Sequence, residues 1–183
     1  TTILQGASRI GGWLKLQDGR ILRNEGTLTW SSNIGSNIIN VNGAITNASG
    51  GTWIDKPATG QSNSIGIQIA GDSAVFNNQG SYKKQGSSSS NISIAFNNSG
   101  SVDVQEGMLS LAKGGTQTGT FDVASGATLQ LASGTHDFNG GSITSDGTLL
   151  ISGGIVNMNI PYNIEGTGKF IQSGGTLQGN STF

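Results

Sequence analysis

Residues 74–81 read AVFNNQGS, and residues 94–101 read IAFNNSGS. The two stretches are identical at five of eight positions, so the chain contains an internal repeat. The two stretches begin 20 residues apart. A repeat interval of this size is typical of solenoids, in which each unit covers the apolar edge of its neighbour. This repeat indicates the fold more directly than any local propensity.

Turn signals extend the same repeat along most of the chain. A short apolar segment followed by glycine recurs at intervals of roughly 20 to 29 residues. The glycines concerned are Gly26, Gly51, Gly80, Gly100, Gly126, Gly147 and Gly168. A constant turn with a variable interval indicates stacked coils whose loops differ in length, and the 183 residues then make seven to eight coils.

Short strands of alternating polarity lie between these turns. Four of them are Val102-Asp103-Val104, Leu109-Ser110-Leu111, Phe121-Asp122-Val123 and Leu129-Gln130-Leu131. Because side chains alternate between the two sides of a strand, the apolar residues point inward and Asp103, Ser110, Asp122 and Gln130 point outward. The 31 glycines oppose helices. The sequence therefore predicts an all-β parallel solenoid with about 20 to 29 residues in each coil.

A sandwich or barrel of hairpins is the alternative architecture. Asp18-Gly19, Asn42-Gly43, Asn139-Gly140 and Asp146-Gly147 are the dipeptides that tight hairpin turns prefer. The two folds differ in one contact. In a solenoid, equivalent residues of successive coils stack, so Phe76 lies on Phe96, and Asn77 on Asn97 or Asn78 on Asn98 forms an amide ladder. Turn formation is the other role open to these asparagines.

Composition excludes several classes of function. Nine basic and ten acidic residues leave a net charge of −1, which offers no basic surface to nucleic acid or anionic lipid. The chain has no cysteine, so it has neither a disulfide nor a thiolate site. Apolar runs are only a few residues long, and we expect no membrane insertion by this segment.

The stretch from 96 to 131 resembles a known type of repeat. It contains FNNSGSVDV (96–104), GMLSL (107–111), GTFDV (119–123) and GATLQL (126–131). These phrases are similar to the β-strand repeats of large secreted bacterial surface proteins, namely filamentous-haemagglutinin-like adhesins and autotransporter passengers. The similarity is best over residues 90–178 and weaker over 1–60.

This resemblance implies a right-handed parallel β-helix, with residues 1–183 forming a single solenoid segment excised from a longer chain. It also implies an extracellular or bacterial cell-surface location, and a structural stalk or adhesion segment without catalytic residues or cofactors. The expected partners are neighbouring repeats of the parent chain, and surface glycans or host and cell-surface proteins.

Asp103 and Asp122 are the best candidates for catalysis, which keeps a carbohydrate-binding or carbohydrate-cleaving β-helix open as the alternative function. Stacked coils bring equivalent residues to about 5 Å, the separation of the carboxyl groups in a retaining glycosidase. The step from Asp103 to Asp122 is shorter, however, than the step from Phe76 to Phe96. This spacing predicts that the aspartates lie on different faces, and we expect no enzyme activity.

Two polar segments interrupt the repeat. Residues 81–90 read SYKKQGSSSS, and we predict a loop that leaves the rod. This loop is either a flexible connection or a contact loop in which Tyr82, Lys83 and Lys84 meet a ligand. Residues 55–60 are a second predicted protrusion. His136, the single histidine, is expected in a surface loop, and one histidine cannot supply a histidine-rich metal site.

Overall fold

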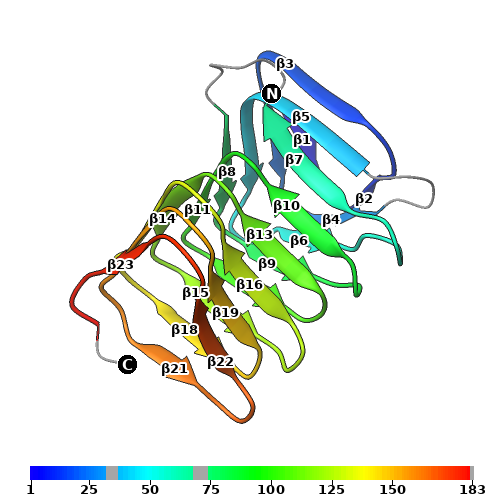
Figure 1. Ribbon diagram of the computed structural model, residues 1–183. Helices are drawn as coiled ribbons and strands as arrows, with labels where there is room; N and C mark the ends of the chain where they lie inside the picture. Colours follow the sequence, from blue (N-terminus) through cyan, green and yellow to red (C-terminus); the bar gives the residue numbers. More distant parts are fainter. Residues whose placement is uncertain (32–36, 68–73, 182–183) are drawn as a thin grey trace.

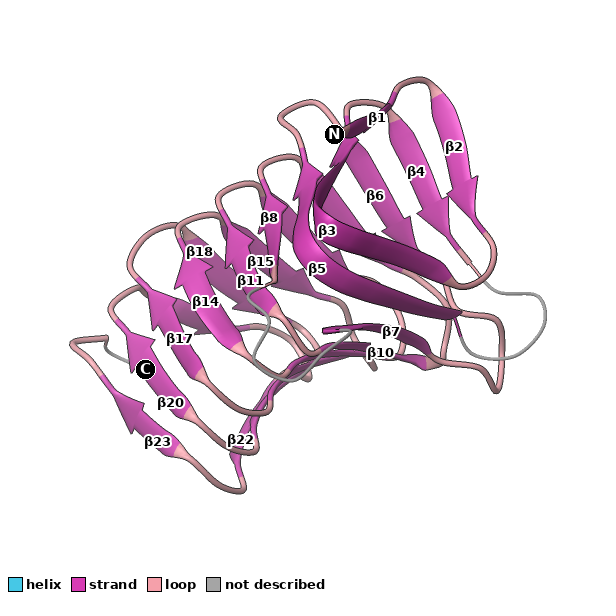
Figure 2. Ribbon diagram, turned by 90° about the horizontal axis from the view of Figure 1, so that it is seen from above, coloured by secondary structure: helices cyan, strands magenta, loops and turns pink. Residues whose placement is uncertain are grey.

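The computed structural model describes residues 1–31, 37–67 and 74–181, and all the regular structure in these ranges is β-strand. Every strand pair is parallel, and the chain winds in successive coils around one axis (Figure 1). The coils have three faces, as the view from above shows (Figure 2). We number the coils from one to eight by the strand that each contributes to the first face.

The first face is an eight-stranded sheet. Its strands, in the order of the coils, are β2 (Ala7–Ile10), β4 (Thr27–Trp30), β6 (Thr52–Asp55), β9 (Ser81–Lys84), β12 (Ser101–Val104), β15 (Thr120–Val123), β18 (Ser142–Ser145) and β21 (Tyr162–Ile164).

The other two faces belong to one 15-stranded sheet, because the long strands β3 (Leu14–Asn24) and β5 (Asn37–Asn47) bend around the corner between them. The second face continues with β7 (Asn63–Ile67), β10 (Ser89–Ile92), β13 (Met108–Leu111), β16 (Thr128–Leu131), β19 (Thr148–Ile151) and β22 (Lys169–Gln172). The third face contains β1 (Thr2–Leu4), β8 (Val75–Asn78), β11 (Ala95–Asn98), β14 (Gly114–Gln117), β17 (Thr135–Phe138), β20 (Ile155–Met158) and β23 (Thr176–Gln178).

This architecture confirms the all-β parallel solenoid and its seven to eight coils. It excludes the hairpin sandwich, since no antiparallel pair is present in the described strands. The longest step between register partners on the first face joins Trp53 to Tyr82. One of the shortest joins Val102 to Phe121. The upper limit of the predicted coil length is therefore confirmed, and the lower limit was one residue too high.

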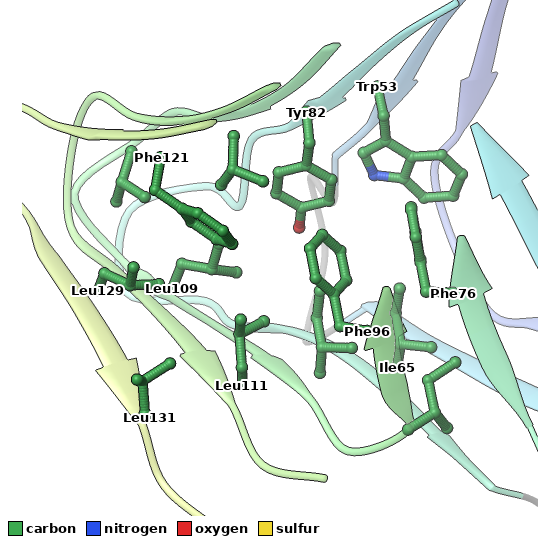
Figure 3. Packing of buried hydrophobic residues seen from close by; sticks show 14 of the residues in the cluster. Trp53, Ile65, Phe76, Tyr82, Phe96, Leu109, Leu111, Phe121, Leu129 and Leu131 are labelled. Atoms are coloured by element: carbon green, nitrogen blue, oxygen red, sulfur yellow. The ribbon is translucent and has the colours of Figure 1, made fainter. Parts of the chain in front are cut away.

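The core is a continuous apolar column along the axis. The inward residues of the four predicted alternating strands are all buried. Phe76 stacks on Phe96 with ring centroids 5.2 Å apart, as predicted, and Trp53 meets Phe76 edge to face at 5.0 Å. Tyr82 joins this cluster from the first face (Figure 3). Burial of these rings is the main favourable term in the stability of the coils.

Asparagines form the predicted ladder, and it is longer than the repeat indicated. Asn78 Nδ2 donates to Asn98 Oδ1 at 2.8 Å, and the same 2.8 Å bond joins Asn24 to Asn47 and Asn47 to Asn78. All four side chains are buried. Outside the core, Asn97 Nδ2 donates to Asn77 Oδ1 at 3.1 Å. Both predicted pairs therefore exist, one inside and one outside the coil.

The glycines that mark the repeat belong to two different corners. Gly26, Gly51, Gly80 and Gly100 each precede a strand of the first face, where the next member is Gly119 rather than Gly126. Gly147 and Gly168 instead precede strands of the second face. At the corner before the first-face strands, glycine is required because there is no room for a side chain. A Cβ on Gly100 would lie 2.1 Å from the carbonyl oxygen of Gly80 in the preceding coil.

Candidate functional site on the first face and its corner

Lys83, Asp103 and Asp122 form one outward column on the first face. They occupy the third position of β9, β12 and β15, and they are register partners in sequence. Neighbouring parallel strands are about 4.8 Å apart, so each side chain lies directly above the next. The prediction that the two aspartates lie on different faces is wrong, because the coil between them is one residue shorter than the coil between Lys83 and Asp103.

The predicted loop at residues 81–90 is also wrong. Residues 81–84 form β9 and residues 89–92 form β10, both within the stack. Tyr82 and Lys84 point inward and have no exposed surface, so neither is available to a ligand from solvent. Only Lys83 of the three predicted contact residues points outward, where it is half-buried.

Tyr82 belongs to a buried polar cluster that we did not predict. Asp55, at the end of β6, accepts a hydrogen bond from the Tyr82 hydroxyl at 2.6 Å on one oxygen. Its other oxygen accepts from Asn63 Nδ2, also at 2.6 Å. Burial away from water raises the pKa of Asp55. The two hydrogen bonds, the Ser90 hydroxyl and the positive charge of Lys84 lower this pKa in part. The same burial raises the pKa of Tyr82 well above its ordinary value.

Lys84 extends the cluster to the corner between the first and second faces. It is the register partner of Asp55, and its ammonium group donates to the carbonyl oxygens of Gln85, Gly86 and Glu106 at 3.1, 2.8 and 3.1 Å. Burial lowers the pKa of Lys84, whereas the charges of Asp55 and Glu106 raise it. The cluster therefore ties coils 3, 4 and 5 together at this corner.

A recess of about 440 Å³ lies at this corner. Its walls come from Ser31, from residues 56–59, from Gly86 and Ser87, and from Glu106. Residues 56–62 leave the regular coil, which confirms most of the second predicted protrusion; Asp55 instead ends β6 and is buried. Ser88 holds this loop, since its hydroxyl accepts from Gly60 N and donates to Ala58 O. The volume suits a small ligand.

The carboxylate pair has the backbone register expected of a glycosidase pair but a different setting. Gln105 Nε2 donates to Asp103 Oδ2, and Gln85 Nε2 donates to Gln105 Oε1 at 2.9 Å, so Asp103 belongs to a surface amide network. Asp122 is exposed. Neither aspartate lines the corner recess or the amide-lined groove at residues 77–79, 97–99, 116 and 118. Water exclusion, which strengthens catalytic electrostatics, is missing at this pair.

His136 was predicted in a surface loop, and that prediction is wrong. It lies in β17 with its ring fully buried, in the same column as Phe76 and Phe96. Its Nε2 donates to the carbonyl of Ser133 at 3.1 Å, which leaves Nδ1 unprotonated. Desolvation lowers the pKa of His136 to about 4.

Sequence signals for the buried cluster were present but weak. Asp55 and Asn63 flank an apparent loop, and Tyr82 and Lys84 alternate with polar neighbours, so no apolar period marked their inward positions. In residues 1–31, 37–67 and 74–181, no three His, Cys, Asp or Glu side chains gather as a metal site. The same ranges contain no helix that is long and apolar enough to cross a membrane.

No family model, no curated protein and no solved structure matches the chain.

Proposed function

We propose that this chain is a structural stalk or adhesion segment of a large bacterial cell-surface or secreted protein. The observation that carries the proposal is the single core that runs through eight coils without interruption. At about 4.8 Å per coil, the described coils make a rod of about 38 Å. Such a stack transmits force between its ends, because each coil is hydrogen-bonded to the next along all three faces.

The outer surface supports the same role. Charged residues are few and nearly balanced, and most outward positions carry serine, threonine or carboxamide side chains. Such a surface keeps a repetitive rod dispersed without attracting polyanions. The resemblance of residues 90–178 to exported bacterial repeats supports placement outside the cell.

Pulling the chain from its two ends tests the mechanical proposal. We expect stepwise lengthening in a single-molecule force experiment, with each coil releasing about 60 to 100 Å of extended chain. The hydrogen bonds between coils run along the pulling direction, so the coils should detach one at a time from the ends, each at a measurable force. Extension at negligible force, without discrete steps, would overturn the structural role.

Carbohydrate cleavage is the second candidate, and the register pairing of Asp103 with Asp122 is the observation that favours it. The test is product release from a panel of neutral and acidic polysaccharides, followed by chromatography. The structural role predicts no product. Product that is lost in both Asp103→Asn and Asp122→Asn would establish the enzyme instead.

A further inference from the structure

A polar stripe runs along the outside of the third face. Its first row is the outward third position of successive strands, and its second row begins the following corner. The first row is Asn77, Asn97, Thr116, Asp137, Asn157 and Gln178, and the second is Gln79, Ser99, Thr118, Asn139 and Asn159. We call these eleven residues the amide stripe.

The chemistry of the amide stripe is uniform. It contains one charged residue, Asp137, and no apolar or aromatic side chain. Ile155, at the outward first position of β20, is exposed beside the stripe, but the stripe itself offers a protein partner little apolar surface to bury, although such burial drives most protein association. A polyanion would find no cation to neutralise. The complementary surface is uncharged and rich in hydroxyl groups.

Hydrogen bonds within the stripe hold its side chains in place. Asn97 Nδ2 donates to Asn77 Oδ1, and the main-chain N–H of Thr116 donates to Asn97 Oδ1 at 3.0 Å. Farther along, Asn159 Nδ2 donates to Asn139 Oδ1 at 2.9 Å. Side chains that are already ordered lose less conformational entropy on binding a ligand.

The stripe is hollowed at coils 3 to 5 by a groove of about 250 Å³. Asn77, Gln79, Asn97, Ser99, Thr116 and Thr118 line it, together with the buried ladder residues Asn78 and Asn98. The groove lies where the β11–β14 ladder is irregular. These two strands share only the pair Asn98↔Gln117, and Thr116 N bonds to a side chain rather than to β11 main chain.

Unused hydrogen-bonding groups face this groove. Within the described part of the chain, Asn77 Nδ2, the Gln79 carboxamide and the Ser99 and Thr116 hydroxyls have no hydrogen-bond partner. A carboxamide presents a donor and an acceptor side by side, and two hydroxyls on adjacent carbons of a sugar present the matching pair.

From this arrangement we infer that the amide stripe binds a neutral oligosaccharide chain lying parallel to the solenoid axis, with one sugar ring in the groove formed by Asn77, Gln79, Asn97 and Thr116. The coil rise of about 4.8 Å is comparable to the advance per sugar in an extended glycan, so successive sugars meet the stripe residues of successive coils. Without an aromatic platform each contact is weak, and affinity accumulates over several rungs.

The amide stripe is a different surface from Asp103 and Asp122, and glycan binding there is a function additional to the structural role. The test is NMR titration of the isotope-labelled chain with cellohexaose, following the side-chain amide signals. We expect saturable shifts at Asn77, Gln79 and Asn97 with a dissociation constant of about 1 mM. The double variant Asn77→Ala/Gln79→Ala should weaken binding about tenfold, because it removes two hydrogen-bonding groups.

Asn91→Ala/Gln130→Ala is the matched control, since both residues lie on the outside of the second face. It should bind cellohexaose as the unmodified chain does, and circular dichroism should be the same for all forms. Absence of saturable shifts, shifts confined to the second face, or equally tight binding of hexagalacturonate would overturn the inference. None of these outcomes touches the mechanical proposal, which only the pulling and cleavage experiments decide.

Discussion

Coils 1 to 5 and coils 6 to 8 fill the same interior columns with different chemistry. At the end of the third-face strands, Asn24, Asn47, Asn78, Asn98 and Gln117 occupy the column in the first half, whereas Phe138 and Met158 occupy it in the second. An interior column on the second face also changes from polar to apolar side chains, one coil earlier. It holds Asn63 and Ser90, and then Leu109, Leu129 and Leu149.

The difference shows two ways of holding one coil on the next. An amide rung must meet another amide at hydrogen-bond distance, so it specifies which residue lies above which. Apolar side chains attract without direction and accept exchange for another apolar side chain of similar volume at small cost. The two longest coils begin at Leu28 and Trp53 in the first half, where directional rungs keep the register despite the longer loops.

The largest expected effect on stability comes from replacing Asn78, which lies between Asn47 and Asn98 in the buried ladder. Asn78→Leu removes bonds to both Asn47 and Asn98 and leaves buried polar atoms without partners, which costs about 3 kcal/mol or more. Met158→Leu, in the same column, should cost less than about 1.5 kcal/mol. Urea unfolding with an unchanged slope measures both. Equal losses would mean that the two halves do not differ.

Acid should destabilise the second half of the solenoid through His136, which lies in coil 6. Its pKa is about 4 in the folded chain against 6.5 when unfolded, so the unfolded chain binds the extra proton between these values. Stability should therefore fall by about 3 kcal/mol as the pH drops from 6.5 to 4. In His136→Leu this part of the pH dependence should vanish. A variant that kept the full acid dependence would exclude His136 as its source.

Asp55 in coil 3 has the opposite dependence. Its raised pKa means that the folded chain keeps the proton longer, so its contribution is complete below pH 3.8 and is lost as the pH rises. Tyr82→Phe removes the 2.6 Å bond to Asp55 and should cost about 1 to 2 kcal/mol at neutral pH, with a smaller loss near pH 3.8. Thermal unfolding across pH reports this. A loss independent of pH would indicate a packing effect instead.

The smallest effect is expected on the outer first face. Asp122→Asn changes a charge on an exposed side chain and should alter stability by less than about 0.5 kcal/mol. Asp103→Asn should behave similarly, because its bond from Gln105 lies near the surface. A large loss in either variant, measured by urea unfolding, would show that the outer column contributes to holding coils 4 to 6 together.

Local sequence signals were sufficient to predict the solenoid, its approximate coil number and the stacking of Phe76 on Phe96. They were sufficient because glycine corners and period-two strands repeat along the chain. The asparagine ladder followed from the same repeat, although only its Asn78 to Asn98 rung was visible in the pattern.

The lengths of individual coils and the positions of the polar interior residues emerged only from the three-dimensional packing. Coil length depends on the loops, and one residue fewer between Asp103 and Asp122 was enough to mislead their assignment to faces. Tyr82, Lys84 and His136 resemble surface residues in sequence, because polar side chains carry no inward signal of their own. Their burial is favourable only once hydrogen-bond partners are in place: Asp55 and Glu106 from neighbouring coils for Tyr82 and Lys84, and the Ser133 carbonyl of the same coil for His136.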